Sequence, residues 1–192
     1  MGPLLNAAAF LINICITFYI YVLILRVFMQ KFRVSWYNPV SQGVIKLTQP
    51  IVSVSRRCFP GFRGVDLAIV LVACVLEGIK VWVMHIIYGD VLVGIWGLLV
   101  LAVVYAISDT LTLYCLMIVV VAVASWFTSG RPNPLVKVCD TIVSPLMNRV
   151  RRRLPAMAGF DWSPVLVLII IQLIRILLVI PAQQVGLMLL GH

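Results

Sequence analysis

The segment from Asn38 to Asp66, NPVSQGVIKLTQPIVSVSRRCFPGFRGVD, occurs twice in the chain. The segment from Asn133 to Asp161, NPLVKVCDTIVSPLMNRVRRRLPAMAGFD, aligns with it without a gap at an offset of 95 residues. The shared residues are mostly helix starters, helix breakers and charges, so common apolar composition does not explain the match. They are Asn38 and Asn133, Pro39 and Pro134, Pro50 and Pro145, Arg56 and Arg151, Arg57 and Arg152, Pro60 and Pro155, Gly64 and Gly159, and Asp66 and Asp161. The chain is therefore predicted to be a tandem duplication.

The composition is that of a membrane protein. Hydrophobic residues make up 63% of the chain, charged residues 11%, and the mean hydropathy is +1.13, which is more apolar than ordinary soluble domains. The apolar runs 4–28, 67–87 and 162–181 each have about the 20 residues that span a bilayer core. A fourth run, 91–127, is long enough for one span or for two short ones.

The positive charges decide between these alternatives. Twelve of the fifteen Lys and Arg lie in the two repeated loops, 29–66 and 128–161. Basic loops stay in the cytoplasm, so an even number of spans must separate them. The sequence therefore predicts an all-α bundle of four transmembrane helices, with both basic loops in the cytoplasm and both termini on the outer side of the membrane. The third span is expected at about 98–127, and residues 91–97 either lie flat or extend it.

The repeat divides the chain into two units. The first, 1–90, contains spans 4–28 and 67–87 around the basic loop 29–66. The second, 91–192, contains spans 98–127 and 162–181 around the basic loop 128–161.

Each basic loop is predicted to carry an amphipathic interfacial helix. Asn38 and Asn133 are expected N-caps, each followed by a proline at the first helical position. Apolar residues at helical spacing then form one face: Val40, Val44, Leu47 and Ile51 in the first copy, and Leu135, Val138, Ile142 and Leu146 in the second. We expect Pro50 to break or kink the first helix, so that a second short helix carries Arg56 and Arg57. The result would be a broken hairpin on the inner leaflet in each loop.

The basic motif has two interpretations. Arg56, Arg57, Arg151, Arg152 and Arg153 can act as topology determinants that touch anionic lipid headgroups, or they can dock a cytoplasmic protein partner. Arg26, near the inner end of the first span, is expected to snorkel to the headgroups.

Five polar residues within the spans form the candidate site. Glu77 and Lys80 lie three residues apart on one helical face, and Gln172 and Arg175 repeat that spacing at the same offset of 95. Asp109 adds a second acid. Ionisable groups at this depth cost about 2.5–3.5 kcal/mol each on insertion scales, so they should face the bundle interior. Two acids and two bases then form either a neutral polar network that fixes helix packing or a site for an ion or proton.

Other function classes find no support in the sequence. The five cysteines and two histidines show neither a metal-site nor a CxxC spacing, and no P-loop or nucleophile elbow occurs. We therefore expect no enzyme, no cofactor and no metal. Nucleic-acid binding is also not expected, because membrane orientation already accounts for the net charge of +9. Anionic lipids are the expected partners, and a homo-oligomer and a cytoplasmic protein partner remain open.

The repeated pattern NP-x10-P-x5-RR-x-(F/L)P-x3-G-x-D resembles the YggT family of bacterial inner-membrane proteins, in its two-repeat form. The resemblance implies a role linked to osmotic tolerance and potassium homeostasis, to cell division, or to assembly of a membrane complex. It assigns no ligand or catalytic residue. Two functional hypotheses follow: monovalent cation transport or sensing through the polar cluster, and a non-enzymatic scaffold that docks partners through the basic loops.

Overall fold

The computed structural model describes residues 2–55, 66–89, 94–127, 133–153 and 161–191. Within these residues the secondary structure is helical. The elements in chain order are α1 (Pro3–Lys31), α2 (Pro39–Ser55), α3 (Leu67–Tyr88), α4 (Ile95–Phe127), α5 (Pro134–Arg151), α6 (Ser163–Ile174), the π-helical segment η1 (Arg175–Val179) and α7 (Ile180–Leu190).

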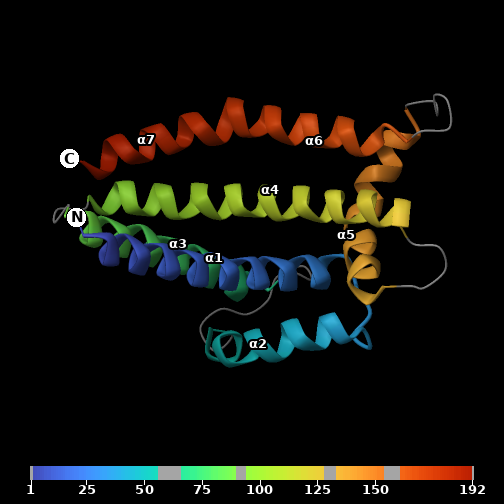
Figure 1. Cartoon of the computed structure of the whole chain (residues 1–192), viewed down its shortest axis with the longest axis horizontal. Helices are drawn as coiled ribbons and strands as arrows, with labels where there is room; N and C mark the ends of the chain where they lie inside the picture. Colours follow the sequence, from blue (N-terminus) through green and yellow to red (C-terminus); the bar gives the residue numbers. More distant parts are fainter. Residues whose placement is uncertain (1, 56–65, 90–93, 128–132, 154–160, 192) are drawn as a thin grey trace.

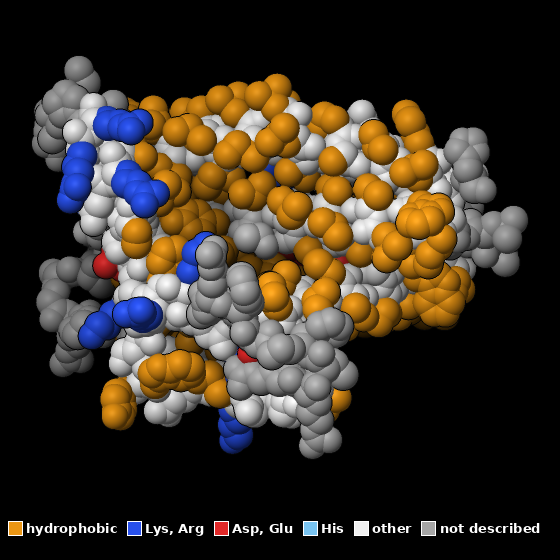
Figure 2. Space-filling model, turned by 180° about the vertical axis from the view of Figure 1, so that it is seen from behind, with side chains coloured by type: hydrophobic (Ala, Val, Ile, Leu, Met, Phe, Trp, Pro, Cys, Tyr) orange, Lys and Arg blue, Asp and Glu red, His pale blue; other side chains and the backbone are white. Residues whose placement is uncertain are grey.

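Four stretches of helix are long and apolar enough to cross a membrane: Pro3–Lys31, Leu67–Tyr88, Ile95–Ser125 and Ser163–Leu190. Figure 1 shows α1, α3, α4 and the continuous α6–η1–α7 segment running side by side, with both chain termini at one end. Apolar side chains cover the length of this bundle, while Lys and Arg gather at the end where α5 lies (Figure 2). The predicted four-span helical bundle is confirmed.

The third span begins earlier than predicted. Ile95, Trp96 and Gly97 belong to α4, so these residues extend the helix. Two glycines permit this packing, because a Cβ atom at Gly94 or Gly97 would overlap the backbone of Leu189 or Leu190 in α7. The Gly94 amide also donates a hydrogen bond of 3.0 Å to the Leu190 carbonyl. The end of the fourth span is thereby held against the start of the third.

The fourth span ends later than predicted. It continues past Pro181 to Leu190, instead of stopping at the proline. A proline inside a helix lacks an amide donor and clashes with the carbonyl four residues earlier. Here Pro181 lies in the first turn of α7, directly after η1, whose wider turn relaxes the α-helical hydrogen-bond register. The helix therefore bypasses the proline without ending.

The expected break in the loop helices is also wrong. α2 continues through Pro50 to Ser55, and α5 continues through Pro145 to Arg151. In each helix, buried residues on both sides of the proline hold the chain in place: Thr48 and Val52 in α2, and Val143 and Met147 in α5. Tertiary packing offsets the lost hydrogen bond. The N-caps are confirmed, since Asn38 Oδ1 accepts from the Val40 amide and Asn133 Oδ1 from the Leu135 amide, both at 2.9 Å.

The two loop helices pack differently. In Figure 1, α5 lies across the end of the bundle, whereas α2 runs beside α1. The buried face of α5 is apolar and joins the main core through Val138, Ile142 and Val143. The buried face of α2 consists of Ser41, Val44, Thr48 and Val52. Of the predicted apolar stripe of α2, Leu47 and Ile51 are exposed.

Arg26 accounts for the polar character of the α2 contact. Its side chain is only 4% exposed, and its guanidinium donates hydrogen bonds to Thr48 Oγ1 at 2.5 Å and to Gln49 Oε1 at 2.9 Å. The expectation that Arg26 snorkels to the headgroups is therefore wrong, because α2 supplies the polar partners. The residue 95 positions later is Val121, so the second repeat has no charge to satisfy at this point.

Candidate functional site

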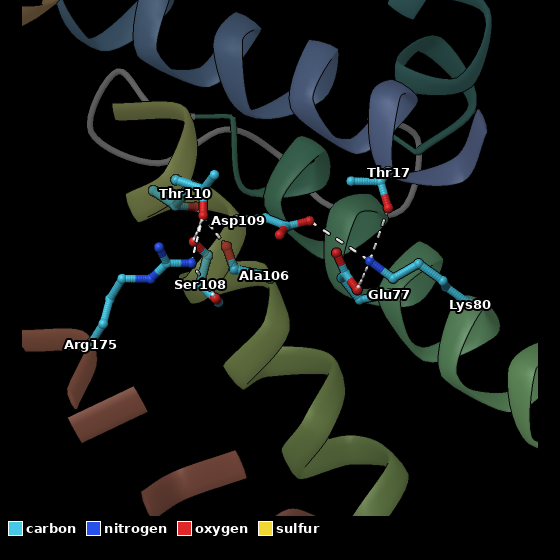
Figure 3. A network of polar contacts seen from close by, with 9 residues as sticks. Thr17, Glu77, Lys80, Ala106, Ser108, Asp109, Thr110 and Arg175 are labelled. Atoms are coloured by element: carbon cyan, nitrogen blue, oxygen red, sulfur yellow. Dashed lines mark hydrogen bonds and ion pairs between the residues drawn. The ribbon is translucent and has the colours of Figure 1, made fainter. Parts of the chain in front are cut away.

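Three charged side chains meet between α3 and α4, near the middle of the bundle. Lys80 Nζ lies 2.7 Å from Glu77 Oε2 and 3.7 Å from Asp109 Oδ2, and it donates a hydrogen bond of 3.3 Å to Thr17 Oγ1 of α1. Figure 3 shows Asp109 and Glu77 converging on the lysine from two helices. We call Glu77, Lys80 and Asp109 the central triad.

The triad is buried to different degrees. The Glu77 side chain is fully buried, while those of Lys80 and Asp109 are 13% and 16% exposed. Glu77 Oε1 accepts no hydrogen bond from any described residue. The triad also holds two carboxylates but only one ammonium group. With all three groups ionised, one negative charge has no counter-charge within the triad.

Arg175 lies apart from this triad. Its Nη2 atom donates hydrogen bonds of 3.3 Å to Ser108 Oγ and 2.7 Å to Thr112 Oγ1, both in α4. Ser108 and Asp109 are sequence neighbours that point to different sides of α4, so Arg175 and the triad are on opposite sides of that helix (Figure 3). The four charges predicted to form one neutral cluster are thus divided into a triad and a separate arginine bound by hydroxyl groups.

Gln172 is not part of either group. Its side chain is exposed on α6 and makes no hydrogen bond to another described residue. The shared spacing of Glu77–Lys80 and Gln172–Arg175 therefore leads to different environments. In the first repeat the acid is buried, and in the second the amide faces outward.

A cavity of about 290 Å³ lies beside Lys80 of the triad. Lys80, Met84 and His85 line it along α3, and the other walls come from Asn13, Val81, Leu101, Tyr105 and Leu187. The Lys80 ammonium lies 6.0 Å from the centroid of the Tyr105 ring. His85 Nδ1 is 3.2 Å from the Val81 carbonyl, an ordinary contact within one helix. Through this cavity the lysine has space for water on one side.

Two charged residues of the second basic loop, Arg151 and Asp161, form a separate ion pair. Arg151 Nη2 and Nε lie 2.6 and 2.8 Å from Asp161 Oδ2, and Asp161 Oδ1 accepts a hydrogen bond of 3.0 Å from the Ser163 amide. Burial raises the pKa of Asp161, but the hydrogen bonds from Ser163 and Arg151 outweigh it and leave the pKa below its ordinary value. Arg151 therefore fixes the start of α6, whereas Arg152 and Arg153 are exposed.

The remaining repeat residues fall into three groups. Asn38 donates a hydrogen bond of 2.8 Å from Nδ2 to the Pro134 carbonyl, so it joins the two loops. Asp66 is buried, and its carbonyl accepts from the Ile69 amide at the start of α3. Outside the described residues lie Arg56, Arg57, Pro60, Gly64, Pro155 and Gly159.

The sequence reasoning missed the hydroxyl partners of the two partly buried bases, Lys80 and Arg175. Thr17, Ser108 and Thr112 satisfy Lys80 and Arg175, and none of them stands out by residue type. The repeat did carry a signal, since Thr17 and Thr112 are 95 residues apart, as are Lys80 and Arg175. Across the described part of the chain, no group of three or more His, Cys, Asp and Glu residues could hold a metal ion.

These features define a class: a polytopic α-helical membrane protein made of two tandem repeats, each with two spans and an amphipathic helix between them. The family model CCB3/YggT matches the chain twice, over residues 5–87 and 100–182. The chain belongs to the CCB3/YggT family.

The similar proteins cover nearly the whole chain. The protein "Uncharacterized protein YggT" of Escherichia coli strain K12 is 35% identical over 187 residues, which are 97% of this chain and 96% of the relative. A Vibrio alginolyticus protein is 36% identical over 167 residues, covering 86% and 89%. A Pseudomonas aeruginosa protein is 28% identical over 175 residues, covering 91% and 89%. No solved structure matches the chain.

Proposed function

We propose that the central triad binds one monovalent cation, either a proton or an alkali cation, and that the protein supports monovalent cation homeostasis, potassium being the first candidate. The observation that carries the proposal is the charge count of the triad. Lys80 compensates one of the two carboxylates, Glu77 and Asp109, and leaves one negative charge for a cation. Ionisable groups this deep in a membrane protein commonly mark ion or proton pathways.

The cavity beside Lys80 supports an access route. It follows Lys80, Met84 and His85 along α3 toward the end with the termini. The positive-inside rule assigns that end to the periplasm, since the basic loops lie at the other. We therefore propose that both termini are periplasmic in a bacterial inner membrane, and that the cation enters from that side. No catalytic role or cofactor is part of this proposal.

The test is cation flux in liposomes reconstituted with the purified protein, with potassium, sodium and proton gradients measured separately. Asp109→Asn removes the uncompensated charge and should abolish flux, and Glu77→Gln should do the same. The matched control is Asp140→Asn, which makes the same chemical change at an exposed carboxylate of α5. Equal flux for wild type and Asp109→Asn, or no flux under any gradient, would refute the proposal.

A second candidate function rests on the exposed arginines. Arg149, Arg152 and Arg153 are exposed at the end of α5, where basic side chains gather in Figure 2. Such a surface is suited to anionic lipid or to an acidic cytoplasmic partner. This alternative makes the protein a membrane scaffold without enzymatic activity.

The scaffold hypothesis predicts a loss of binding without loss of insertion. Arg152→Gln with Arg153→Gln should reduce the anionic lipid retained by the purified protein, as measured by mass spectrometry. Lys31→Gln with Lys46→Gln removes the same charge from exposed positions elsewhere and serves as the control. If both double variants retain the same lipid as wild type, α5 is not the docking surface.

A further inference from the structure

The two repeats leave corresponding surfaces in different environments. In the first repeat, α3 packs between α1 and α4, and its residues Glu77 and Val81 are buried against α4. The residues 95 positions later, Gln172 and Ile176, are exposed on α6, with Ile176 48% exposed. Among the described elements, α6 contacts α4, α5 and the adjoining η1.

The α4 side of the α3–α4 contact also has an exposed counterpart, which lies on α1. In α4, Leu101 and Ala102 are buried, with Leu101 packed against Val81 of α3. A Cβ atom at Gly78 would lie 3.6 Å from the Ala102 Cβ, so the two helices are close at this point. The counterparts of these α4 residues in α1 are Asn6 and Ala7, and both are exposed.

The exposed face of α1 continues along the same line. Phe10 and Ile14, which correspond to Tyr105 and Asp109 of α4, are 61% and 47% exposed. Among the described residues α1 and α6 make no contact, and Figure 1 shows them on opposite sides of the bundle. The chain therefore cannot cover one of these faces with the other.

We infer that the protein forms a dimer in the membrane, in which α6 of each copy packs against α1 of the other. This contact repeats, between chains, the contact that α3 and α4 make within a chain. A second copy is the partner that carries both faces. Because the two faces differ, each copy uses each face once, and a two-fold axis along the membrane normal closes the assembly.

The polar residues favour this arrangement. Gln172 is a carboxamide exposed at the depth of the central triad, where lipid offers it no hydrogen bond. On α1 of the second copy, Asn13 lies at the depth that Ser108 has on α4; it is exposed and also lines the cavity beside Lys80. Two amides that both donate and accept can satisfy one another across such a contact.

One difference between the repeats affects the distance between α6 and α1 in the proposed dimer. Leu173 stands where the first repeat has Gly78, so the helices must be further apart between chains than within the chain. Ala7 opposes it, as Ala102 opposes Gly78. A cysteine in place of Leu173 removes the bulk and places a thiol opposite position 7.

The experiment uses cysteine cross-linking of the full chain in native membranes. Ala7→Cys and Leu173→Cys are produced together on two differently tagged copies, in a background without the five native cysteines. Oxidation should give a disulfide-linked dimer that carries both tags. The control replaces Leu173→Cys by Ile174→Cys, which is also exposed but lies on another side of α6, and should give several-fold less of that dimer.

A mass measurement tests the assembly independently of the disulfide. Native mass spectrometry of the wild-type protein should show two copies, and Ala7→Trp should shift it to one copy by filling the contact. A monomeric wild type would overturn the inference. Efficient cross-linking of Leu173→Cys to itself, without cross-linking to Ala7→Cys, would overturn it as well, because that pattern requires α6 to pack against α6.

Discussion

Arg175 donates a hydrogen bond of 2.7 Å to Thr112, and the residues 95 positions earlier, Lys80 and Thr17, make the same contact at 3.3 Å. In each repeat, therefore, a base on the second span is tied to a hydroxyl on the first span. What differs is the acid. Glu77 accompanies Lys80, whereas the corresponding Gln172 faces outward and carries no charge. Both repeats thus keep the hydrogen bond between base and hydroxyl. The carboxylates Glu77 and Asp109 lie where the first repeat contacts the second.

Removing the hydroxyl at Thr112 should destabilise the protein. Thr112→Val keeps the shape but leaves the partly buried Arg175 guanidinium with one hydrogen bond fewer, at a cost of about 1–3 kcal/mol. Thr110→Val is the control, because the Thr110 hydroxyl bonds only to the Ala106 carbonyl of its own helix. Reversible unfolding in mixed micelles measures both. Equal stability of the two variants would show that the Arg175–Thr112 hydrogen bond contributes nothing to the free energy of unfolding.

Removing the lysine should cost more than removing an acid. Lys80→Met leaves two carboxylates facing each other without a counter-charge, and breaking a buried pair in this way costs about 3–5 kcal/mol. Glu77→Gln removes one charge and leaves Lys80 paired with Asp109, so its effect should be smaller. The double variant Lys80→Met with Glu77→Gln should recover part of the loss. Unfolding free energies of the three proteins check this order.

The Arg151–Asp161 pair predicts loss of stability in acid. The pKa of Asp161 is lowered from its ordinary value of 3.8, so the pair contributes fully above that value and is lost as the pH falls through the lower folded-state pKa. Asp161→Asn should therefore lower the melting temperature near neutral pH and remove part of the decline in acid. Asp140→Asn should leave the pH profile unchanged. Melting curves between neutral pH and pH values below the ordinary pKa test both variants.

Two glycines predict opposite responses to alanine. Gly97→Ala forces the α4 backbone away from Leu190, so it should destabilise the protein by more than about 1 kcal/mol. Gly43 in α2 has no atom within 4 Å of an added Cβ, and Gly43→Ala should stabilise the helix by about 0.5–1 kcal/mol. Unfolding measurements on the two variants decide whether the close contact of α4 and α7 exists.

Much of the fold follows from the sequence. The repeat and the basic loops gave the number of spans, and Asn38 and Asn133 marked the starts of the loop helices, because these signals are local or periodic. The ends of the helices were harder to predict from the sequence. Pro181 and Pro50 are strong breakers in isolation, but η1 accommodates the first and packing on both sides accommodates the second.

The sequence predicted which charged residues lie inside the bundle, but not which of them contact one another. Burial of Glu77 and Lys80 follows from their position in an apolar run, and Asp109 does join them. Arg175 could not be separated from Asp109 by charge alone, because opposite charges favour pairing. Its partners became clear only from the rotation of α4, which turns Ser108 and Asp109 to different helices. Arg26 was likewise assigned to the lipid headgroups because its partner, α2, was expected on the membrane surface.

The hydrogen bond from Asn38 to the Pro134 carbonyl ties the first residues of one loop helix to the first residues of the other. The two loops come from different repeats, and each leads directly into a different pair of spans. A force that lipid tension or a bound protein applies to either loop is therefore shared by both halves of the molecule. We expect this end of the bundle to respond to such a force as one unit, although it is built from two repeats.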